Sequence, residues 1–164
     1  MQAVNSLEAN GKIVEKIFRF NYLIDGEEEE DAGIVQIEFS DGSVLELDLV
    51  SDGESIAIKW KNRQSSIEES QLDKGFKILL TERSPYCQLK GRKVVHTDEL
   101  LFGAIEQELD EMVIAGVGLL ADDGSLLVYY NGGNYAKLYF NQHPPSLGNP
   151  FKLQWRHGGF IGVS

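Results

Sequence analysis

Two stretches of the chain carry the same alternating pattern around the same turn, and this repeat constrains the fold more than any other feature. Residues 35–47 read VQIEFSDGSVLEL, and residues 117–129 read VGLLADDGSLLVY. Asp-Gly-Ser stands at 41–43 in the first stretch and at the matching place, 123–125, in the second. Apolar residues at every second position are typical of β-strands, because successive side chains point to opposite faces. The sequence therefore predicts a mainly β protein with an internal duplication.

Two further matches extend the repeat. Gly-x-Ile begins at both Gly11 and Gly103, and ESIAIKW after Gly53 matches NYAKLYF after Gly133. The predicted strands lie at about 12–20, 33–39, 43–50 and 55–61, then at about 104–110, 113–121, 125–130 and 135–141. We expect a single domain, residues 1–164, made of repeat one (about 11–61), a connector (62–102), repeat two (about 103–141) and a C-terminal strand or tail (142–164).

Turn chemistry predicts the register of these strands. The apolar residues of 33–39 and 43–50 share a face only if the loop between them holds an odd number of residues. Ser40-Asp41-Gly42 meets this condition with Gly42 in the left-handed conformation, and residues 122–124 repeat it. Even loops follow, Asp52-Gly53 as a type I′ turn and Gly132-Gly133 as its equivalent. The predicted cross-strand pairs are Leu49–Ile56, Leu47–Ile58, Leu45–Trp60 and Glu46–Lys59.

The connector is expected to contain one short helix, a strand and a loop. Ser65 or Ser66 can cap a helix that Gly75 ends. Residues 76–82 have the pattern of a strand, and residues 84–93 that of an exposed basic loop. The predicted architecture is therefore two related antiparallel β-meanders that form a sandwich or a partly open barrel, with one short helix.

The two meanders differ on the face opposite the shared core. In the first, that face is polar and is expected to contact water; it consists of Gln36, Glu38, Glu46, Asp48, Ala57, Lys59 and Lys61. In the second it is apolar, beside Gly116 and Gly118, and consists of Leu120, Leu126, Val128, Tyr130, Tyr135 and Tyr139. An apolar face of this size needs a cover. Either segment 62–102 or the C-terminal tail packs there, or part of the face binds a partner or a second copy.

The net charge of −11 limits the partners. It argues against nucleic acid and against an anionic membrane surface, because both require basic residues. Residues 1–61 hold 14 acidic and 5 basic side chains, and residues 62–164 hold 12 and 10. Much of this difference comes from an acidic run, Glu27, Glu28, Glu29, Glu30 and Asp31. The run is either a solvated loop or a docking surface for a basic protein.

Catalytic and metal-binding patterns are weak. The sequence lacks phosphate-binding glycine motifs, a nucleophile elbow and a zinc-protease motif. The histidines His96, His143 and His157 are scattered, so we expect neither a metal nor a cofactor. The segment 96–99, His-Thr-Asp-Glu, is the most enzyme-like cluster, and we interpret Thr97 or Asp98 as a helix N-cap there.

Cysteine usage and the N-terminus bear on location. Cys87 is the only cysteine, which excludes an intramolecular disulfide and fits a reducing compartment. We expect it to be a buried, small apolar residue. Residues 1–5 do not resemble a signal peptide, and no apolar run approaches the roughly 18 residues that span a bilayer. The expected location is the cytoplasm.

A binding role is supported by three features: the Asp-Gly-Ser turns, the acidic run from Glu27 to Asp31, and an aromatic face of Tyr130, Tyr135 and Tyr139. In overall character the chain resembles the small acidic, β-rich immunity proteins that bacteria use to neutralise toxin domains. That resemblance implies a basic toxin domain as partner, bound tightly and blocked at its active site. We therefore expect a non-enzymatic protein-binding module.

Two other functions stay open. One is a self-associating domain that buries the second meander in a homodimer. The other is a small-ligand-binding barrel, or an enzyme with a site assembled from distant residues. In that case His96, Asp98 and Glu99 are the first candidates for the site.

Overall fold

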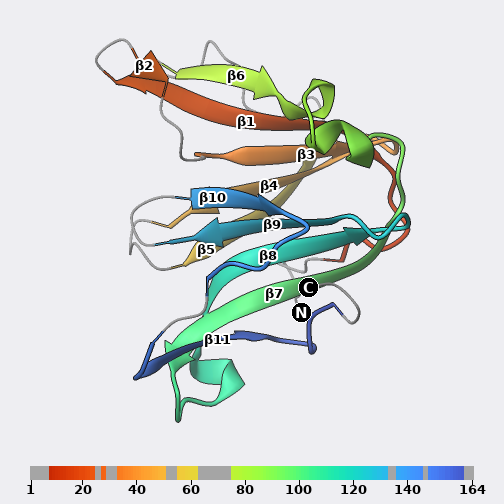
Figure 1. The fold of residues 1–164 in the computed structure, drawn as a ribbon. Coiled ribbons are helices and arrows are strands. Elements are labelled where there is room, and N and C mark those ends of the chain that lie inside the picture. Colours follow the sequence, from red (N-terminus) through yellow and green to blue (C-terminus); the bar gives the residue numbers. More distant parts are fainter. Residues whose placement is uncertain are drawn as a thin grey trace.

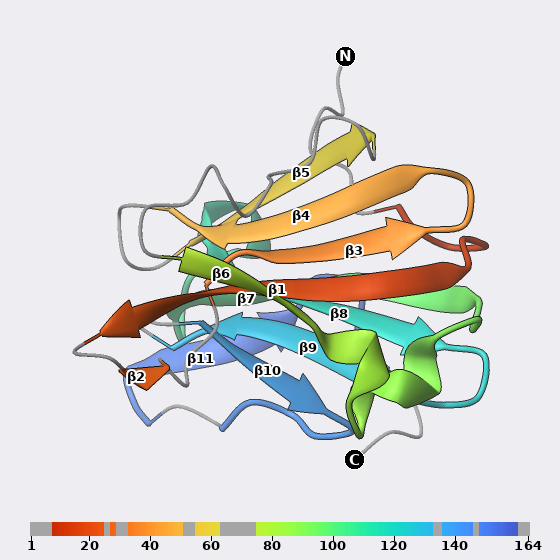
Figure 2. The same cartoon turned by 90° about the horizontal axis from the view of Figure 1, so that it is seen from above.

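Antiparallel strands form two facing sheets in the computed structural model, which describes residues 8–24, 27–28, 33–50, 55–62, 75–132, 136–145 and 148–160 (Figures 1 and 2). The first sheet contains β1 (Val14–Ile24), β2 (Glu27–Glu28), β3 (Val35–Phe39), β4 (Ser43–Leu49), β5 (Ile56–Asn62) and β6 (Gly75–Leu79). The second sheet contains β7 (Val94–Ala104), β8 (Val113–Ala121), β9 (Leu126–Asn131), β10 (Ala136–Phe140) and β11 (Phe151–Trp155). The fold is therefore mainly β and a sandwich, as the sequence predicted, rather than a closed barrel.

Each sheet contains a four-stranded meander, to which β2 and β6 are added in the first sheet and β11 in the second. The first has the order β2-β1-β3-β4-β5, with β6 also paired to β1, and the second has the order β10-β9-β8-β7-β11. The region of the predicted short helix before Gly75 lies outside the described residues. Short 3-10 turns occur elsewhere, at η3 (Leu80–Glu82), η4 (Tyr86–Leu89) and η5 (Leu109–Glu111). Within the described ranges, no helix has the length and apolar character needed to cross a membrane.

The predicted turns and register are confirmed where the structure describes them. Gly42 and Gly124 have φ of +91° and +90°, the left-handed conformation that suits glycine. Each follows an aspartate whose carboxylate accepts the backbone N–H two residues on, Ser43 to Asp41 at 2.9 Å and Ser125 to Asp123 at 3.0 Å. All four predicted pairs between β4 and β5 are present. The loops at 51–54 and 133–135 lie outside the described residues.

The first strand of the second meander is not where the sequence suggested. It was predicted at about 104–110, but β7 ends at Ala104 and the chain then turns. The side chain of Gln107 accepts the Ala104 N–H at 2.6 Å, and Glu108 and Glu111 form a capping box around η5. These local hydrogen bonds stabilise a tight turn in place of a strand. The Gly-x-Ile at Gly103 was therefore a false match.

Gly91 is the true equivalent of Gly11. The Gly11 N–H donates to the carbonyl of Val94, the Gly91 N–H donates to the carbonyl of Val14, and both distances are 2.7 Å. The two glycines have φ of +90° and +82°. The β1–β3 register shifts after Val14, and the β7–β8 register shifts after Val94, so even the irregularity is repeated.

The duplication covers five strands in each half. In chain order β1, β3, β4 and β5 correspond to β7, β8, β9 and β10, and the registers match. Three cross-strand pairs of the first half have an equivalent in the second. Val14–Phe39 corresponds to Val94–Ala121, Ile37–Leu45 to Leu119–Leu127, and Leu45–Trp60 to Leu127–Phe140. β6 pairs with β1 as β11 pairs with β7. We call β1 and β3–β6 the first unit and β7–β11 the second unit. The expected connector thus holds the last strand of one unit and the first strand of the next.

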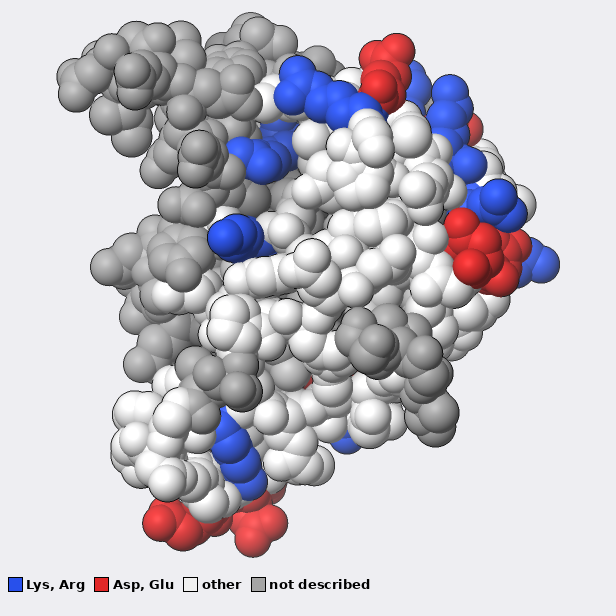
Figure 3. All heavy atoms as spheres, viewed as in Figure 1, with Lys and Arg blue, Asp and Glu red and all other residues white. Residues whose placement is uncertain are grey.

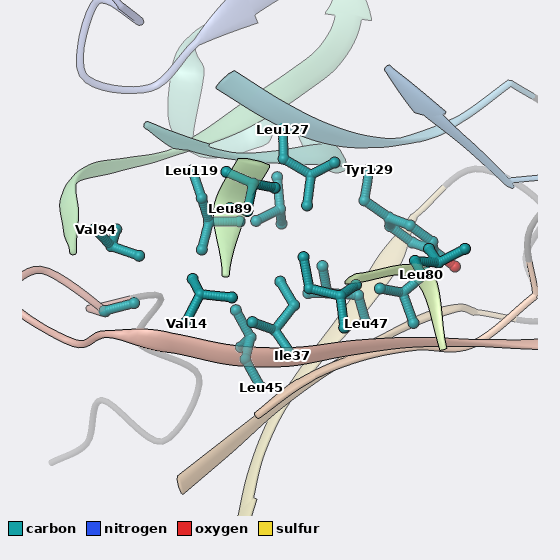
Figure 4. Close-up of a cluster of buried hydrophobic side chains, with 14 of the residues drawn as sticks. Val14, Ile37, Leu45, Leu47, Leu80, Leu89, Val94, Leu119, Leu127 and Tyr129 are labelled. Atoms are coloured by element: carbon teal, nitrogen blue, oxygen red, sulfur yellow. The ribbon is translucent and has the colours of Figure 1, made fainter. Parts of the chain in front are cut away.

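The main core lies between the sheets (Figure 4). Leu45 and Leu47 point into it from β4, and Leu119, Leu127 and Tyr129 point into it from β8 and β9. Full burial of such a leucine stabilises the fold by about 1.5–3 kcal/mol relative to exposure. The Tyr129 hydroxyl donates to the carbonyl of Gly33 at 2.7 Å, which satisfies its polar atom inside the core.

The outer face of the first sheet is less exposed than predicted. Lys59 is exposed as expected, but Gln36, Glu38 and Glu46 are only 0%, 5% and 2% exposed. The Glu46 carboxylate accepts hydrogen bonds from Gln36 at 2.9 Å and from Lys61 at 3.1 Å. The expectation that this whole face contacts water was therefore wrong. Alternation predicts the face on which a side chain lies, but burial also depends on what packs over that face.

Candidate interaction surface

The outer face of the second sheet is partly covered by the C-terminal part of the chain, which confirms one of the two predicted interpretations. β10 and β11 lie at opposite ends of this sheet (Figure 1), and His143, which follows β10, packs edge to face with Trp155 at the end of β11, with ring centroids 5.7 Å apart. Leu126, Val128 and Tyr130 are buried there, in a cluster with Phe160 and the partly buried Trp155. This second apolar cluster is separate from the core between the sheets.

Gly118 makes room for the C-terminal segment. A Cβ atom at this position would lie 2.7 Å from the ring of Phe160 and 2.9 Å from the ring of Trp155. The two rings pack edge to face, with centroids 4.9 Å apart. Glycine at 118 is therefore required for close contact between the tail and β8.

Asp98 holds the tail in place. Its side chain is buried, and its carboxylate accepts the N–H groups of His157 at 3.0 Å and Gly159 at 2.9 Å. It also accepts the N–H of Glu99 at 2.9 Å. Backbone N–H groups bound to a carboxylate are strong, charge-assisted hydrogen bonds. A residue from the most enzyme-like cluster thus has a structural role in this fold.

The interpretation of segment 96–99 as a helix N-cap was wrong, because the whole segment lies within β7. Since side chains alternate along a strand, the outward-facing Asp98 and its neighbour Glu99 lie on opposite faces of the sheet. Glu99 pairs with Arg156 at 2.6 Å, and the His96 ring packs against Phe160 with centroids 5.2 Å apart. His96 and Asp98 therefore share the outer face, whereas Glu99 lies on the opposite face, so the three side chains do not meet as one acid–base site.

The predicted tyrosines occupy different environments. Tyr130 is buried and packs edge to face with Tyr139, with ring centroids 6.2 Å apart. Tyr139 is partly exposed, and the ammonium group of Lys137 lies 5.8 Å from its ring centroid. Tyr135 lies outside the described residues. Tyr139 is thus the predicted tyrosine that the structure places within reach of a partner.

Aromatic residues of the C-terminal strand belong to the same surface, although no site was predicted there. Phe151 is 46% exposed and stacks on Phe102 with centroids 5.3 Å apart, and Ile105 beside it is 47% exposed. The alternating apolar residues in FKLQW were the sequence signal that could have predicted this exposed aromatic surface. Figure 3, in the view of Figure 1, shows that side chains other than Lys, Arg, Asp and Glu make up most of the middle of the surface seen there, with both basic and acidic groups towards its margins.

The acidic run begins in a hairpin. Glu27 and Glu28 form β2, which pairs with Leu23 and Ile24 at the end of β1. Their side chains, and Glu29, Glu30 and Asp31, lie outside the described residues.

The paired Asp-Gly-Ser turns carry equivalent ion pairs. Lys12 contacts Asp41 at 2.5 Å, and Arg92 contacts Asp123 at 3.6 Å. The hydrogen bond from Lys12, with those from Ser43, holds the pKa of Asp41 well below its usual value. Because these pairs are largely exposed, their net contribution to stability is small. They mark the repeat more clearly than they mark a binding site.

The prediction that Cys87 is buried was wrong. Cys87, expected to be buried, is exposed on η4, where Leu89 is the residue that packs into the core. Among the side chains that can be described, no group of three or more His, Cys, Asp or Glu residues is arranged to hold a metal ion.

No protein-family model, curated protein or solved structure matches this chain.

Proposed function

We propose that this chain is a non-enzymatic protein-binding module that contacts its partner through the outer face of the second unit. The proposal is carried by one comparison between equivalent strands. Glu46 on β4 lies opposite Lys59 on β5, whereas Val128 on β9 lies opposite Tyr139 on β10. At this pair, the same backbone arrangement therefore places charged side chains on the outer face of one unit and apolar surface on that of the other.

The next pair shows this contrast on one strand only, because Asp48–Ala57 in the first unit corresponds to Tyr130–Lys137 in the second. Asp48 of the first unit corresponds to Tyr130 of the second, whose ring supports the partly exposed ring of Tyr139. Tyrosine and tryptophan provide large, rigid contact area and are enriched among the residues that dominate binding energy. Tyr139 and Trp155 are the partly exposed tyrosine and tryptophan that have such support on this face.

Charge favours a basic partner. Residues 1–61 alone carry a net charge of −9, from 14 acidic and 5 basic side chains. A field of this sign speeds association with a positively charged protein and weakens as salt is added. The narrower form of the proposal is an immunity protein that neutralises a basic toxin domain. It predicts stoichiometric inhibition of a toxin encoded next to this gene.

The test compares substitutions at equivalent positions. The tagged wild-type chain, Tyr139→Ala and Lys59→Ala are used to capture proteins from the cells that make the chain, and each captured partner is then purified and titrated. We expect Tyr139→Ala to weaken binding about tenfold or more and Lys59→Ala to change it less than about twofold. A chain that captures nothing, or equal effects of the two substitutions, would contradict the proposal.

A further inference from the structure

Among the described residues, no strand pairs with the outer edge of β11. It lies at the end of the strand order, paired with β7 on its other side. Just beyond β11, the Arg156 N–H donates to the carbonyl of Glu99 at 2.9 Å. Hydrogen-bonded pairs recur at every second residue of an antiparallel ladder. The backbone groups of Gln154 and Lys152 therefore face β7, and the N–H and C=O of Leu153 point away from the sheet.

The residues of this edge protect it poorly from pairing. Natural edge strands usually carry charges, proline or a bulge that prevents pairing with another chain. β11 has the sequence FKLQW, in which Lys152 is the one charged residue. Phe151 and Ile105, at one end of β11, are among the most exposed large apolar side chains of the described structure.

The two ends of β11 also differ in charge. Residues 142–164 contain Lys152 and Arg156 but no aspartate or glutamate, in a chain with a net charge of −11. The turn at 105–111 carries the acidic residues Glu106, Glu108, Asp110 and Glu111. This turn lies at the Phe151 end of β11, because the Ile105 N–H donates to the carbonyl of Pro150 at 2.9 Å.

We propose that two copies of this chain pair through β11, antiparallel and centred on Leu153, so that the two five-stranded sheets become one. This register places Phe151 of one copy opposite Trp155 of the second copy, and Lys152 opposite Gln154, so no like charges meet. It also brings the acidic turn of each copy close to Arg156 of the other. The edge is complementary to itself in shape, hydrogen bonding and charge, which is why a second copy is its occupant.

This register determines which backbone hydrogen bonds form between the two copies. Leu153 of each copy donates its N–H to the Leu153 carbonyl of the other, and Trp155 donates to the carbonyl of Phe151. The Phe151 N–H is already bonded to the carbonyl of Gly148 at 3.1 Å, so it adds nothing across the interface. Pairing therefore depends most on the centre of the strand, at Leu153.

The test uses proline, which removes one N–H. Leu153→Pro removes the outward donor and leaves the bonds to β7 in place, a position at which edge strands tolerate proline. Leu138→Pro is the matched control, because Asn141 N–H bonds to β9 at 2.8 Å and alternation turns the Leu138 N–H outward at the opposite edge. Sedimentation equilibrium over a range of concentrations gives the dimer dissociation constant of each full-length protein.

We expect a concentration-dependent dimer for the wild type and for Leu138→Pro, and a dissociation constant raised about tenfold or more by Leu153→Pro. Phe151→Glu is a second variant at an exposed position, and it should weaken the dimer with unchanged circular dichroism. A wild type that stays monomeric at every concentration would overturn the proposal. Equal effects of the two proline substitutions, or a dimer that tolerates both Leu153→Pro and Phe151→Glu, would also overturn it.

Discussion

Ile13 and Lys93 lie opposite each other in an antiparallel bridge that joins the two sheets. On either side of this pair, the Val14 N–H donates to the carbonyl of Arg92 at 2.9 Å, and the Val94 N–H donates to the carbonyl of Lys12 at 2.8 Å. The two bonds are exchanged by a half-turn about an axis between Ile13 and Lys93. The duplicated units therefore meet as the halves of a symmetric dimer do, within one chain.

Gly118→Ala should destabilise the protein by about 1–3 kcal/mol, because the added methyl group would overlap the rings of Phe160 and Trp155. Unfolding in urea measures the change. Gly148→Ala is the control, since a Cβ there meets no atom within 4 Å. Equal stability of Gly118→Ala and wild type would mean that the tail does not pack on β8.

Asp98→Asn should release the C-terminal tail. An amide group replaces one carboxylate oxygen and leaves a buried backbone N–H without an acceptor, which costs about 1–3 kcal/mol. Hydrogen exchange of residues 156–160 should become faster, and the fluorescence of Trp155 should shift to longer wavelength in a Trp60→Phe background. Asp110→Asn, an exposed carboxylate on η5, should leave both signals unchanged. If residues 156–160 exchange their amide hydrogens equally slowly in both variants, Asp98 does not anchor the tail.

Asp48→Asn should stabilise the protein at neutral pH. Burial, with a smaller effect of nearby Glu46, raises the pKa of Asp48 above 3.8. Its favourable contribution is present when the group is protonated, below pH 3.8, and is lost as the pH rises through the folded-state pKa. Asparagine avoids this loss, so the melting temperature of Asp48→Asn should exceed that of the wild type at pH 7 and approach it in acid.

Asp41→Asn should change the stability at neutral pH in the opposite direction. Hydrogen bonds from Lys12 and Ser43 lower the pKa of Asp41, so its contribution is present above pH 3.8 and is lost as the pH falls through the folded-state value. Asp41→Asn should therefore melt below the wild type at pH 7, with the difference vanishing in strong acid. The same pH dependence for both variants would contradict these electrostatic environments.

The sequence predicted the register of the first meander because every signal there is local. Gly42 ends a three-residue turn, and the alternation of Leu45, Leu47 and their partners on β5 leaves one consistent pairing. Asp-Gly-Ser in both halves then locates β8 and β9. Turn chemistry and alternation act over a few residues, so one sequence is enough to read them.

The roles of the tail and of segment 96–99 could not be predicted in this way. The Asp98 carboxylate accepts hydrogen bonds from the N–H groups of His157 and Gly159, which lie 59 and 61 residues further along the sequence. The burial of Glu46 is likewise a property of packing over its sheet face. The sequence did not predict where β7 starts, because the repeat is weak there. Of the four residues 91–94, only Gly91 and Val94 are identical to their counterparts at 11 and 14.

The most direct test of the paired-unit fold is a disulfide between Ile13→Cys and Lys93→Cys, in a Cys87→Ser background. The surrounding hydrogen bonds make this a non-hydrogen-bonded pair, whose Cα atoms lie about 4.5 Å apart, within the range that a disulfide spans. Mass spectrometry of the oxidised, digested monomer should show the two cysteine peptides linked to each other. Two free thiols under the same conditions would mean that the units do not meet at this bridge.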